Sequence, residues 1–370
     1  MKIAIIGIKG IPVIYSGFET FAEEFSTRLV QDKNFKVSVY CRSPYVDKNK
    51  KKYKGVKLIT LPTIKSKNLE TILHSFACTI HACFFAKYDV IYFIGVGNAI
   101  FTLFPRLLGI KTMINVDGFD WRREKWGNFA KSYLRLSSYL AMYLPNIVIT
   151  DSLVIKEYYS QRHKTKYIYI PYGYMDNFKN KNSTRILNKY NLEKNKYFVW
   201  VGRLVPENHV EDLLLAFLKF KTDFKCVVIG DNFYHDEYTE KIFNFVKENK
   251  NIIFMGFLNR EEYASLVKNA YCYVETKRSG GTHPSLVEAM GFGSLIISNN
   301  NSTNKKLLGL NAFYYDNFSD LLKKIEFITK SGSKKYIKDY RKGVKNIAIN
   351  YFNWENITRN YKQLFLSFRQ

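Results

Sequence analysis

Short apolar runs alternate along the chain with segments in which apolar residues recur at helical spacing. The first run, residues 2–8, has the apolar character of a strand that is buried on both faces. A loop with two glycines follows, and apolar residues then recur at helical spacing over about residues 18–31, which predicts a helix. A second strand is predicted at residues 36–41, so the chain begins with a β–loop–α–β unit.

The same alternation continues through most of the chain. It predicts further strands at residues 56–61, 90–94, 112–116, 147–150, 166–170, 197–201, 225–229, 252–254, 271–276 and 295–298. It predicts helices at about residues 69–87, 99–108, 129–143, 210–220, 237–248, 260–270, 318–329, 334–350 and 354–368, and a short helix before residue 166. Strands that alternate with helices favour parallel sheets covered by helices on both faces, so the predicted fold class is α/β.

The pattern is interrupted at residues 175–196, which are polar, rich in Asn and Lys, and without a strong period. We interpret this segment as a linker between two similar domains that face one another. The predicted domains are residues 1–175 and residues 176–350, and residues 351–370 are expected to form a helix that packs back toward the first domain.

One loop in the second half is suited to binding an anion. Residues 279–291 lie between two predicted strands, and Gly280 and Gly281 let the backbone approach a ligand closely. Pro284 fits the first turn of a helix, with Thr282 or His283 as its cap. A glycine-rich loop that leads into a helix N-terminus favours phosphate. The alternative is a tight strand-to-helix connection without a ligand.

Charge and cysteine content narrow the possible partners. The 370 residues carry a net charge of +25 that is spread over both halves, and nucleic acid, anionic membrane or phosphorylated ligands could all bind such a chain. No nucleic-acid-binding motif accompanies the charge, which favours membrane and phosphates. The five cysteines form no C-x-x-C pair, which argues against a disulfide framework or a zinc site and favours a reducing compartment.

No segment predicts secretion or membrane insertion. The first apolar run is too short for a signal peptide, and residues 72–86 are shorter than the roughly 20 residues that span a bilayer. We therefore expect a cytoplasmic protein that is soluble or peripheral to the membrane.

Motifs in both halves together resemble the GT-B glycosyltransferases of family four, a retaining group that uses nucleotide sugars. In the second half they are Gly202-Arg203-Leu204, Gly230, Gly256-Phe257-Leu258 and residues 284–290. Residues 6–20, 115–123, 205–208 and 280–285 resemble a subgroup that contains polysaccharide rhamnosyltransferases. The resemblance implies two facing Rossmann-like domains with a cleft between them, the first binding the acceptor and the second the nucleotide-sugar donor.

For the donor, the resemblance implies a diphosphate contact from Arg203, which is one of two catalytic candidates. Asn208 stands where the family usually has lysine, so it can only donate a neutral hydrogen bond. Glu288 matches the second glutamate of the family's E-x7-E pattern, which holds the ribose, whereas Gly280 replaces the first. That departure disfavours a glucose or mannose donor and fits a 6-deoxy sugar such as rhamnose. The other implied donor-binding residues are Gly10, Gly17, Gly230, Phe257, Leu258, Gly281, Thr282, His283, Ser285 and Leu286.

For the acceptor, the second catalytic candidate is Asp117, which falls where many relatives carry a histidine near the reacting sugar, although an aspartate at a strand end could also cap a helix. Glu19 could cap its own helix or reach the acceptor. Trp121, Arg122 and Arg123 could bind an acceptor diphosphate or form a solvated rim. No D-x-D pair is present and Arg203 can replace a cation, so neither a metal nor another cofactor is expected. His74 and His81 are interpreted as structural.

These residues lead to three hypotheses for the function. The leading one is transfer of L-rhamnose from dTDP-rhamnose to a lipid-diphosphate-linked saccharide in capsule or cell-wall polysaccharide synthesis. The second keeps the fold and changes the donor to a UDP-hexose. The third is a nucleotide- or nucleic-acid-binding α/β protein without transferase activity.

A lipid-linked acceptor would place the enzyme at the inner face of the cell membrane. The candidate contacts are the loop lysines, which we define as Lys48, Lys50, Lys51, Lys52 and Lys54, and the helix at residues 69–87, whose surface could include Phe76, Phe84 and Phe85. The alternative is that these aromatic side chains belong to the core and that the lysines are only solvated.

Overall fold

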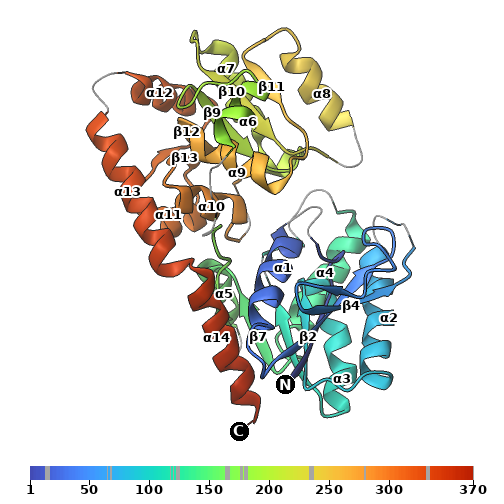
Figure 1. Ribbon diagram of the computed structural model, residues 1–370. Helices are drawn as coiled ribbons and strands as arrows, with labels where there is room; N and C mark the ends of the chain where they lie inside the picture. Colours follow the sequence, from blue (N-terminus) through green and yellow to red (C-terminus); the bar gives the residue numbers. More distant parts are fainter. Residues whose placement is uncertain are drawn as a thin grey trace. The chain divides into compact units, whose positions relative to one another are not determined.

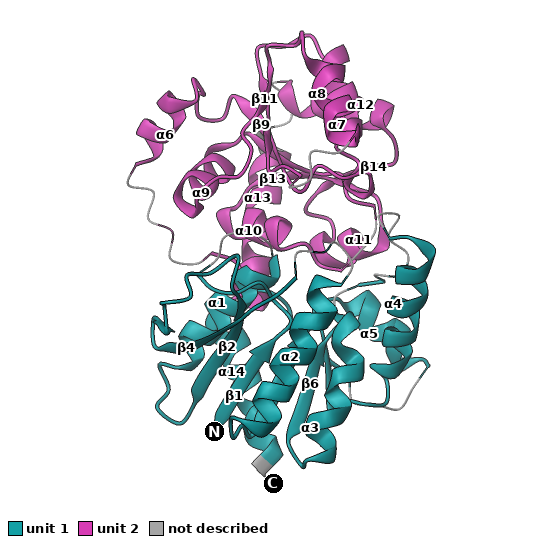
Figure 2. Cartoon of the chain, turned by 90° about the vertical axis from the view of Figure 1, so that its right-hand side faces the viewer, with its two compact units in different colours: residues 1–172, 354–370 teal, residues 173–353 magenta. Residues whose placement is uncertain are grey.

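The computed structural model describes residues 1–12, 17–64, 66, 69–116, 118–119, 121, 126–162, 167–175, 178, 182–232, 237–278, 281–330 and 334–369. It divides into two compact units (Figure 2), of which unit 1 comprises residues 1–172 and 354–370 and unit 2 comprises residues 173–353. Each unit has a parallel sheet covered by helices. The predicted α/β class with two Rossmann-like domains is confirmed.

Unit 1 is built on an eight-stranded sheet with the strand order β3-β4-β2-β1-β5-β6-β7-β8. The strands are β1 (Lys2–Ile6), β2 (Lys36–Arg42), β3 (Lys52–Tyr53), β4 (Val56–Leu61), β5 (Val90–Ile94), β6 (Lys111–Asn115), β7 (Ile147–Thr150) and β8 (Tyr167–Tyr169). All neighbours pair in parallel except β3 and β4. Residues 3–6 of β1 are fully buried because β2 and β5 flank this strand and helices cover both faces.

The helices of unit 1 are α1 (Gly17–Leu29), α2 (Glu70–Phe84), η1 (Val96–Thr102), α3 (Leu103–Leu107), α4 (Asn128–Leu140), α5 (Leu153–Ser160), α14 (Trp354–Leu366) and η5 (Ser367–Arg369). The C-terminal helix α14 packs against α1 and the sheet through aromatic side chains. The rings of Phe25 and Tyr361 lie 4.5 Å apart, and the Tyr361 hydroxyl is 3.0 Å from that of Tyr92 on β5. The end of the chain therefore completes the core of the first unit.

Unit 2 has a six-stranded parallel sheet with the order β11-β10-β9-β12-β13-β14 (Figure 1). The strands are β9 (Tyr197–Val201), β10 (Lys225–Ile229), β11 (Ile252–Phe254), β12 (Cys272–Glu275), β13 (Leu295–Asn299) and β14 (Phe313–Tyr315). The helices are α6 (Ser183–Lys189), η3 (Pro206–Asn208), α7 (Val210–Lys219), α8 (Glu237–Val246), α9 (Arg260–Asn269), α10 (Pro284–Phe292), α11 (Ser302–Leu308), α12 (Phe318–Thr329) and α13 (Lys334–Tyr351).

Two local predictions were wrong, and some short elements were not predicted. The predicted linker contains helix α6, because Ile186 and Leu187 are buried in the core of unit 2 and hold this segment on the domain. The helix predicted at residues 99–108 is instead the 3-10 helix η1 followed by α3. Helix α11 and strand β14 were not predicted. In the part of the chain that the structure describes, no helix combines the length and apolar character needed to cross a bilayer.

Candidate functional site

Three glycines follow neighbouring strands of unit 2 at their carboxyl ends. Gly202, Gly230 and Gly256 come after β9, β10 and β11, and the Gly230 amide donates a hydrogen bond of 2.8 Å to the Gly256 carbonyl. Gly230 has a φ of +112°, and a Cβ there would lie 2.0 Å from the Gly202 carbonyl oxygen, so only glycine fits. Open parallel sheets bind ligands at the carboxyl ends of their strands, which makes this edge the candidate site.

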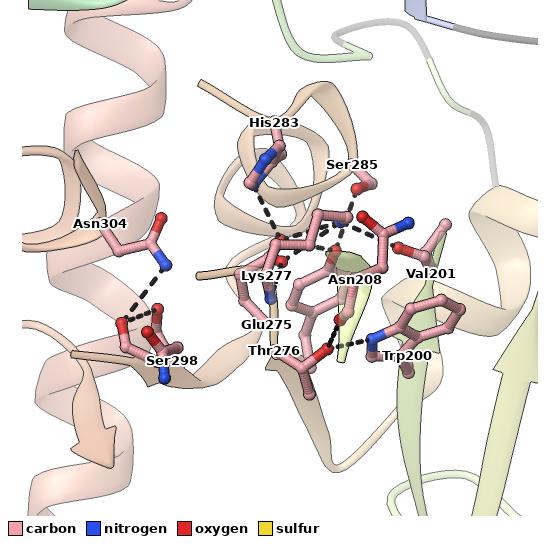
Figure 3. Close-up of polar contacts among 12 residues, drawn as sticks. Trp200, Val201, Asn208, Glu275, Thr276, Lys277, His283, Ser285, Ser298 and Asn304 are labelled. Atoms are coloured by element: carbon pink, nitrogen blue, oxygen red, sulfur yellow. Dashed lines mark hydrogen bonds and ion pairs between the residues drawn. The ribbon is translucent and has the colours of Figure 1, made fainter. Parts of the chain in front are cut away.

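Arg203 occupies the turn after β9 and is exposed to solvent. Its carbonyl accepts a hydrogen bond of 2.8 Å from the Asn208 side-chain amide. The Asn208 carbonyl in turn accepts a hydrogen bond from the Thr276 hydroxyl, which accepts one of 2.7 Å from the Trp200 indole (Figure 3). Asn208 therefore fixes the shape of the arginine turn and links it to the end of β12.

A buried ion pair lies beside this turn and was not predicted from the sequence. Glu275, the last residue of β12, is fully buried, and its carboxylate accepts hydrogen bonds from the Lys277 amide at 3.1 Å and from the Lys277 ammonium at 3.2 Å. The same ammonium donates to the Val201 carbonyl at 3.2 Å (Figure 3). The pair joins the carboxyl ends of β9 and β12, directly before Gly202 and Arg203.

The loop after β12 leads into α10, and the cap position is held by one of the two predicted residues. His283 is the N-cap residue and Pro284 begins the helix, yet no side chain makes a capping hydrogen bond. The His283 ring is instead turned toward β12, with Nδ1 3.6 Å from a carboxylate oxygen of Glu275 (Figure 3). Thr282 is buried, as is Gly281.

Three further predicted donor residues belong to α10. Glu288 is 9% exposed and accepts a hydrogen bond of 2.5 Å from the Tyr263 hydroxyl on α9. Burial and the charge of Glu288 raise the pKa of Tyr263 well above its usual value, so the tyrosine stays protonated and donates. Ser285 accepts a hydrogen bond of 3.0 Å from Tyr273, whereas Leu286 is fully buried in the core.

The remaining donor residues of unit 2 lie after β11. The side chain of Phe257 is 42% exposed, and Leu258 packs against the core of the unit. Gly256 has a φ of +60°, and a Cβ at this position would meet no atom within 4 Å.

In unit 1, the loop after β1 is held against α1. Gly10 has a φ of +140°, and a Cβ there would lie 2.5 Å from Val46, while Gly17 is the first residue of α1. Glu19 is 5% exposed, and its carboxylate accepts a hydrogen bond of 2.8 Å from the Lys9 amide. The structure thus gives Glu19 a role in fixing this loop.

Trp121 belongs to an aromatic group in unit 1, with its ring 5.3 Å from that of Phe119 and 6.2 Å from that of Tyr158. His74 and His81 make contacts within the unit: His74 is buried with its Nε2 3.2 Å from the Cys41 carbonyl, and His81 Nδ1 is 2.9 Å from the Tyr40 hydroxyl. Burial, with the nearby positive charge of Arg42, lowers the pKa of His74 to about 4.

Four predicted site residues, Asp117, Arg122, Arg123 and Gly280, lie outside the described residues.

Two family models match the chain, one for each half. Residues 1–175 match the model described as "Domain of unknown function (DUF1972)", and residues 182–346 match "Glycosyl transferases group 1".

One relative and several solved structures are similar to this chain over nearly its whole length. An uncharacterized glycosyltransferase of Methanocaldococcus jannaschii is 24% identical over 397 aligned residues, which cover 98% of each chain. Sucrose-phosphate synthase of Thermosynechococcus elongatus matches with a TM-score of 0.81 and 16% identity over 99% of this chain and 98% of that one. Anabaena HepE, solved in complex with UDP-glucose, matches with a TM-score of 0.79 and 16% identity over 99% and 100%.

Proposed function

Because residues 182–346 match the model of the group 1 glycosyl transferases and the chain has the GT-B fold, we propose that the protein is a glycosyltransferase that moves L-rhamnose from dTDP-rhamnose, with retention, to a lipid-diphosphate-linked saccharide. The product would enter capsule or cell-wall polysaccharide. Unit 2 binds the donor in this proposal, and unit 1 contributes the acceptor residues.

The observation that carries the proposal is the group of residues at the carboxyl ends of β9 and β12. Arg203 stands exposed on a turn whose shape is fixed by Asn208. An arginine fork at this place can bind the donor diphosphate and stabilise the negative charge that develops on the leaving group. The backbone amides at the start of α10 add to this stabilisation. Glu288, oriented by Tyr263, binds the ribose hydroxyls.

Glu275 and Lys277 act in this proposal as positioning residues. Their ion pair joins the end of β12 to the Val201 carbonyl, and the Glu275 carboxylate also orients His283 at the start of α10. The arginine turn and the anion-binding loop therefore share one buried support. Such a support matters because the reaction rate can fall by about 100-fold when a catalytic group is displaced by about 1 Å.

The choice of rhamnose as the donor sugar is based on the sequence. Gly280 replaces the glutamate that relatives with a glucose or mannose donor use, which favours a 6-deoxy sugar. A UDP-hexose is the second candidate, because Anabaena HepE, which has the same fold, was solved with UDP-glucose. Trp121, with Arg122 and Arg123, is proposed to bind the acceptor, and Asp117 to face its reacting hydroxyl. The enzyme would then work at the inner surface of the cell membrane.

A donor panel tests the proposal directly. Calorimetric titration and slow hydrolysis are measured with dTDP-rhamnose, UDP-glucose, UDP-galactose and GDP-mannose. We expect dTDP-rhamnose to bind most tightly and to be hydrolysed, with hydrolysis lost in an Arg203→Ala variant. Preference for a UDP-hexose would support the second candidate instead. Binding of none of the four would contradict both.

A further inference from the structure

Helix α2 has an apolar face on its outer side. Leu73, Phe76, Phe84 and the C-cap residue Phe85 are 40%, 46%, 67% and 78% exposed. The side of α2 that faces the sheet is partly polar, with His74, Ser75 and Thr79 buried. A surface helix of a globular protein normally has the opposite arrangement, with polar residues outside. The outward face of α2 is therefore not explained by the packing of unit 1.

The next two helices also expose large apolar side chains. On α3, Leu107 is 75% exposed, and on α4, Phe129 and Leu136 are 84% and 54% exposed. Beyond the end of α4, Tyr143 is 44% exposed. More than half of the large apolar side chains that are exposed in the described part of the chain fall between residues 69 and 143. We name the exposed apolar side chains of residues 69–85, 100–108 and 129–143 the three-helix face.

Specific contacts join these helices into one surface. Phe76 of α2 packs against Phe101 of η1, with 6.1 Å between the ring centres, and the Tyr133 hydroxyl of α4 donates a hydrogen bond of 2.7 Å to the Gly97 carbonyl of η1. Arg106 of α3 donates hydrogen bonds of 2.8 Å to the carbonyls of Tyr143 and Leu144 after α4. Both views show α2 beside α3 (Figures 1 and 2).

The charges of this surface are positive. The described residues of α2, η1, α3 and α4 include one carboxylate, Glu70, which is buried and lies 3.4 Å from the guanidinium of Arg42. They also include Arg106, Lys131 and Arg135, of which both arginines are exposed. Two copies of this surface would repel each other, whereas a layer of anionic phosphate headgroups would be complementary to it.

We infer that the three-helix face binds the surface of an anionic lipid bilayer. Phenylalanine and leucine side chains insert at the boundary between headgroups and acyl chains, tyrosines remain at headgroup level, and the basic residues pair with lipid phosphates. This inference rests on the proposed lipid-linked acceptor for its biological sense, but its physical basis is the exposure and charge of the face. The partner is thus a lipid surface, and contact with it would hold unit 1 where a lipid-linked acceptor is found.

Removal of the most exposed side chain of each helix tests the inference. A triple variant, Phe85→Ser, Leu107→Gln and Phe129→Ser, is compared with the wild-type chain for flotation with vesicles of phosphatidylglycerol and phosphatidylcholine in equal parts. Inserting one such side chain strengthens binding by about tenfold, so we expect the triple variant to bind at least about 100-fold more weakly. The matched control is Leu310→Gln, because Leu310 is 90% exposed but belongs to unit 2, and it should bind as the wild type does.

A second arm tests the choice of partner. Vesicles of phosphatidylcholine alone should bind the wild-type chain more weakly, and a Lys131→Gln, Arg135→Gln variant should lose about fivefold per charge on anionic vesicles only. Triple-variant binding equal to the wild type would overturn the inference. So would a wild-type dimer that the triple substitution makes monomeric without weakening vesicle binding.

Donor hydrolysis measured on the same samples separates the two proposals. A triple variant that hydrolyses dTDP-rhamnose normally but no longer floats supports the inference. Wild-type flotation that depends on the face supports the inference even if dTDP-rhamnose is not the donor. Normal donor hydrolysis by a wild-type chain that does not float overturns the inference alone.

Discussion

Helices α2 of unit 1 and α8 of unit 2 both cover parallel sheets, but their outward faces differ. In α8, Ile242 and Val246 are buried against the unit while Glu240 and Lys241 are exposed. This is close to the arrangement of an ordinary surface helix, with an apolar face inside and a mostly polar face outside, where Phe245 is the one large apolar side chain of α8 that is exposed. Helix α2 packs on its sheet and also exposes a row of leucine and phenylalanine side chains.

The comparison indicates which apolar side chains are needed to form the core and which are available to a binding partner. The helices of unit 2 also expose single apolar side chains, such as Leu218, Phe245 and Phe327, but more than half of the large apolar side chains exposed in the described part of the chain fall between residues 69 and 143 of unit 1. An exposed apolar surface of this extent marks an interaction site. Both units carry a buried ion pair at a strand end, Arg42 with Glu70 in unit 1 and Lys277 with Glu275 in unit 2, but only the second lies next to a proposed catalytic residue, Arg203. Substitutions at the strand ends of unit 2 should therefore affect stability and turnover, whereas substitutions on the three-helix face of unit 1 should affect vesicle binding.

The largest effect is expected from Lys277→Met in unit 2. This change leaves the fully buried Glu275 carboxylate without its ion-pair partner, which should lower the free energy of unfolding by about 3–5 kcal/mol. Thermal unfolding measures the loss as a lower Tm. A Glu275→Gln, Lys277→Met double variant should recover much of it, because no buried charge remains. A single variant as stable as the wild type would show that the pair carries little structural weight.

The next effect separates chemistry from stability. Arg203→Ala should lower kcat by about 100-fold, as the loss of a group that stabilises transition-state charge does, with an almost unchanged Tm because Arg203 is exposed. The Arg203→Lys variant keeps the positive charge but not the planar guanidinium fork, so its kcat should lie between those of the wild type and Arg203→Ala. Vesicle flotation should stay at the wild-type level. Near-normal turnover by a folded Arg203→Ala protein would remove Arg203 from the mechanism.

A smaller effect is expected at the proposed ribose contact. Glu288→Gln replaces a charged hydrogen-bond acceptor by a neutral one, so donor affinity should fall by about tenfold while kcat changes less. Tyr263→Phe removes only the hydrogen bond that orients Glu288 and should weaken donor binding less than Glu288→Gln. Titration calorimetry with the donor gives both values. Equal donor affinity in wild type and Glu288→Gln would exclude the ribose contact.

The fold class was predictable because strands that are buried on both faces have short apolar runs. Residues 3–6 of β1 and residues 197–200 of β9 are fully buried, and both runs stand out in the sequence. The prediction of secondary structure failed where helices consist mostly of polar residues. Helix α6 is rich in polar residues and is held by Ile186 and Leu187. Helix α11 is capped by Asn301, whose side chain accepts a hydrogen bond from the Asn304 amide.

The site was predictable only where residues lie close together in the sequence. Arg203 and Glu288 were named because each stands within a short motif, and their roles stay predictions. Glu275 and Lys277 look in the sequence like charged residues that end a strand. Their importance comes from the Val201 carbonyl, which is brought beside them by the pairing of β9 with β12. A contact between distant strands leaves no local signal.

The smallest effect is expected from the loop lysines of unit 1, and it tells whether charge alone can hold the chain on a membrane. Their charge is partly engaged within the unit: the Lys54 ammonium lies 3.6 Å from the Glu23 carboxylate, and the Lys50 ammonium lies 4.8 Å from the centre of the Tyr53 ring. The loop lysines also contribute no apolar side chain that could insert into the bilayer. Changing all five to Gln should therefore weaken flotation with anionic vesicles by only about fivefold in total, less than the roughly fivefold per charge expected for Lys131 and Arg135, because the loop lysines are partly paired within the unit and are not accompanied by inserted apolar side chains; at physiological salt, charges are screened beyond roughly 8 Å.

The dependence on salt is what distinguishes these lysines from the three-helix face. Binding that depends on the lysines should fall as salt rises, because screening weakens charge pairing. The apolar contribution of the face should persist, because the transfer of apolar side chains out of water does not depend on screening. Donor affinity should stay at the wild-type value in the five-lysine variant, because Arg203 and Glu288, the proposed contacts to the donor diphosphate and ribose, are in unit 2. If the five-lysine variant lost as much flotation as the triple variant of the three-helix face, the membrane contact would have to be assigned to residues 48–54, and the outward face of α2 would again need an explanation.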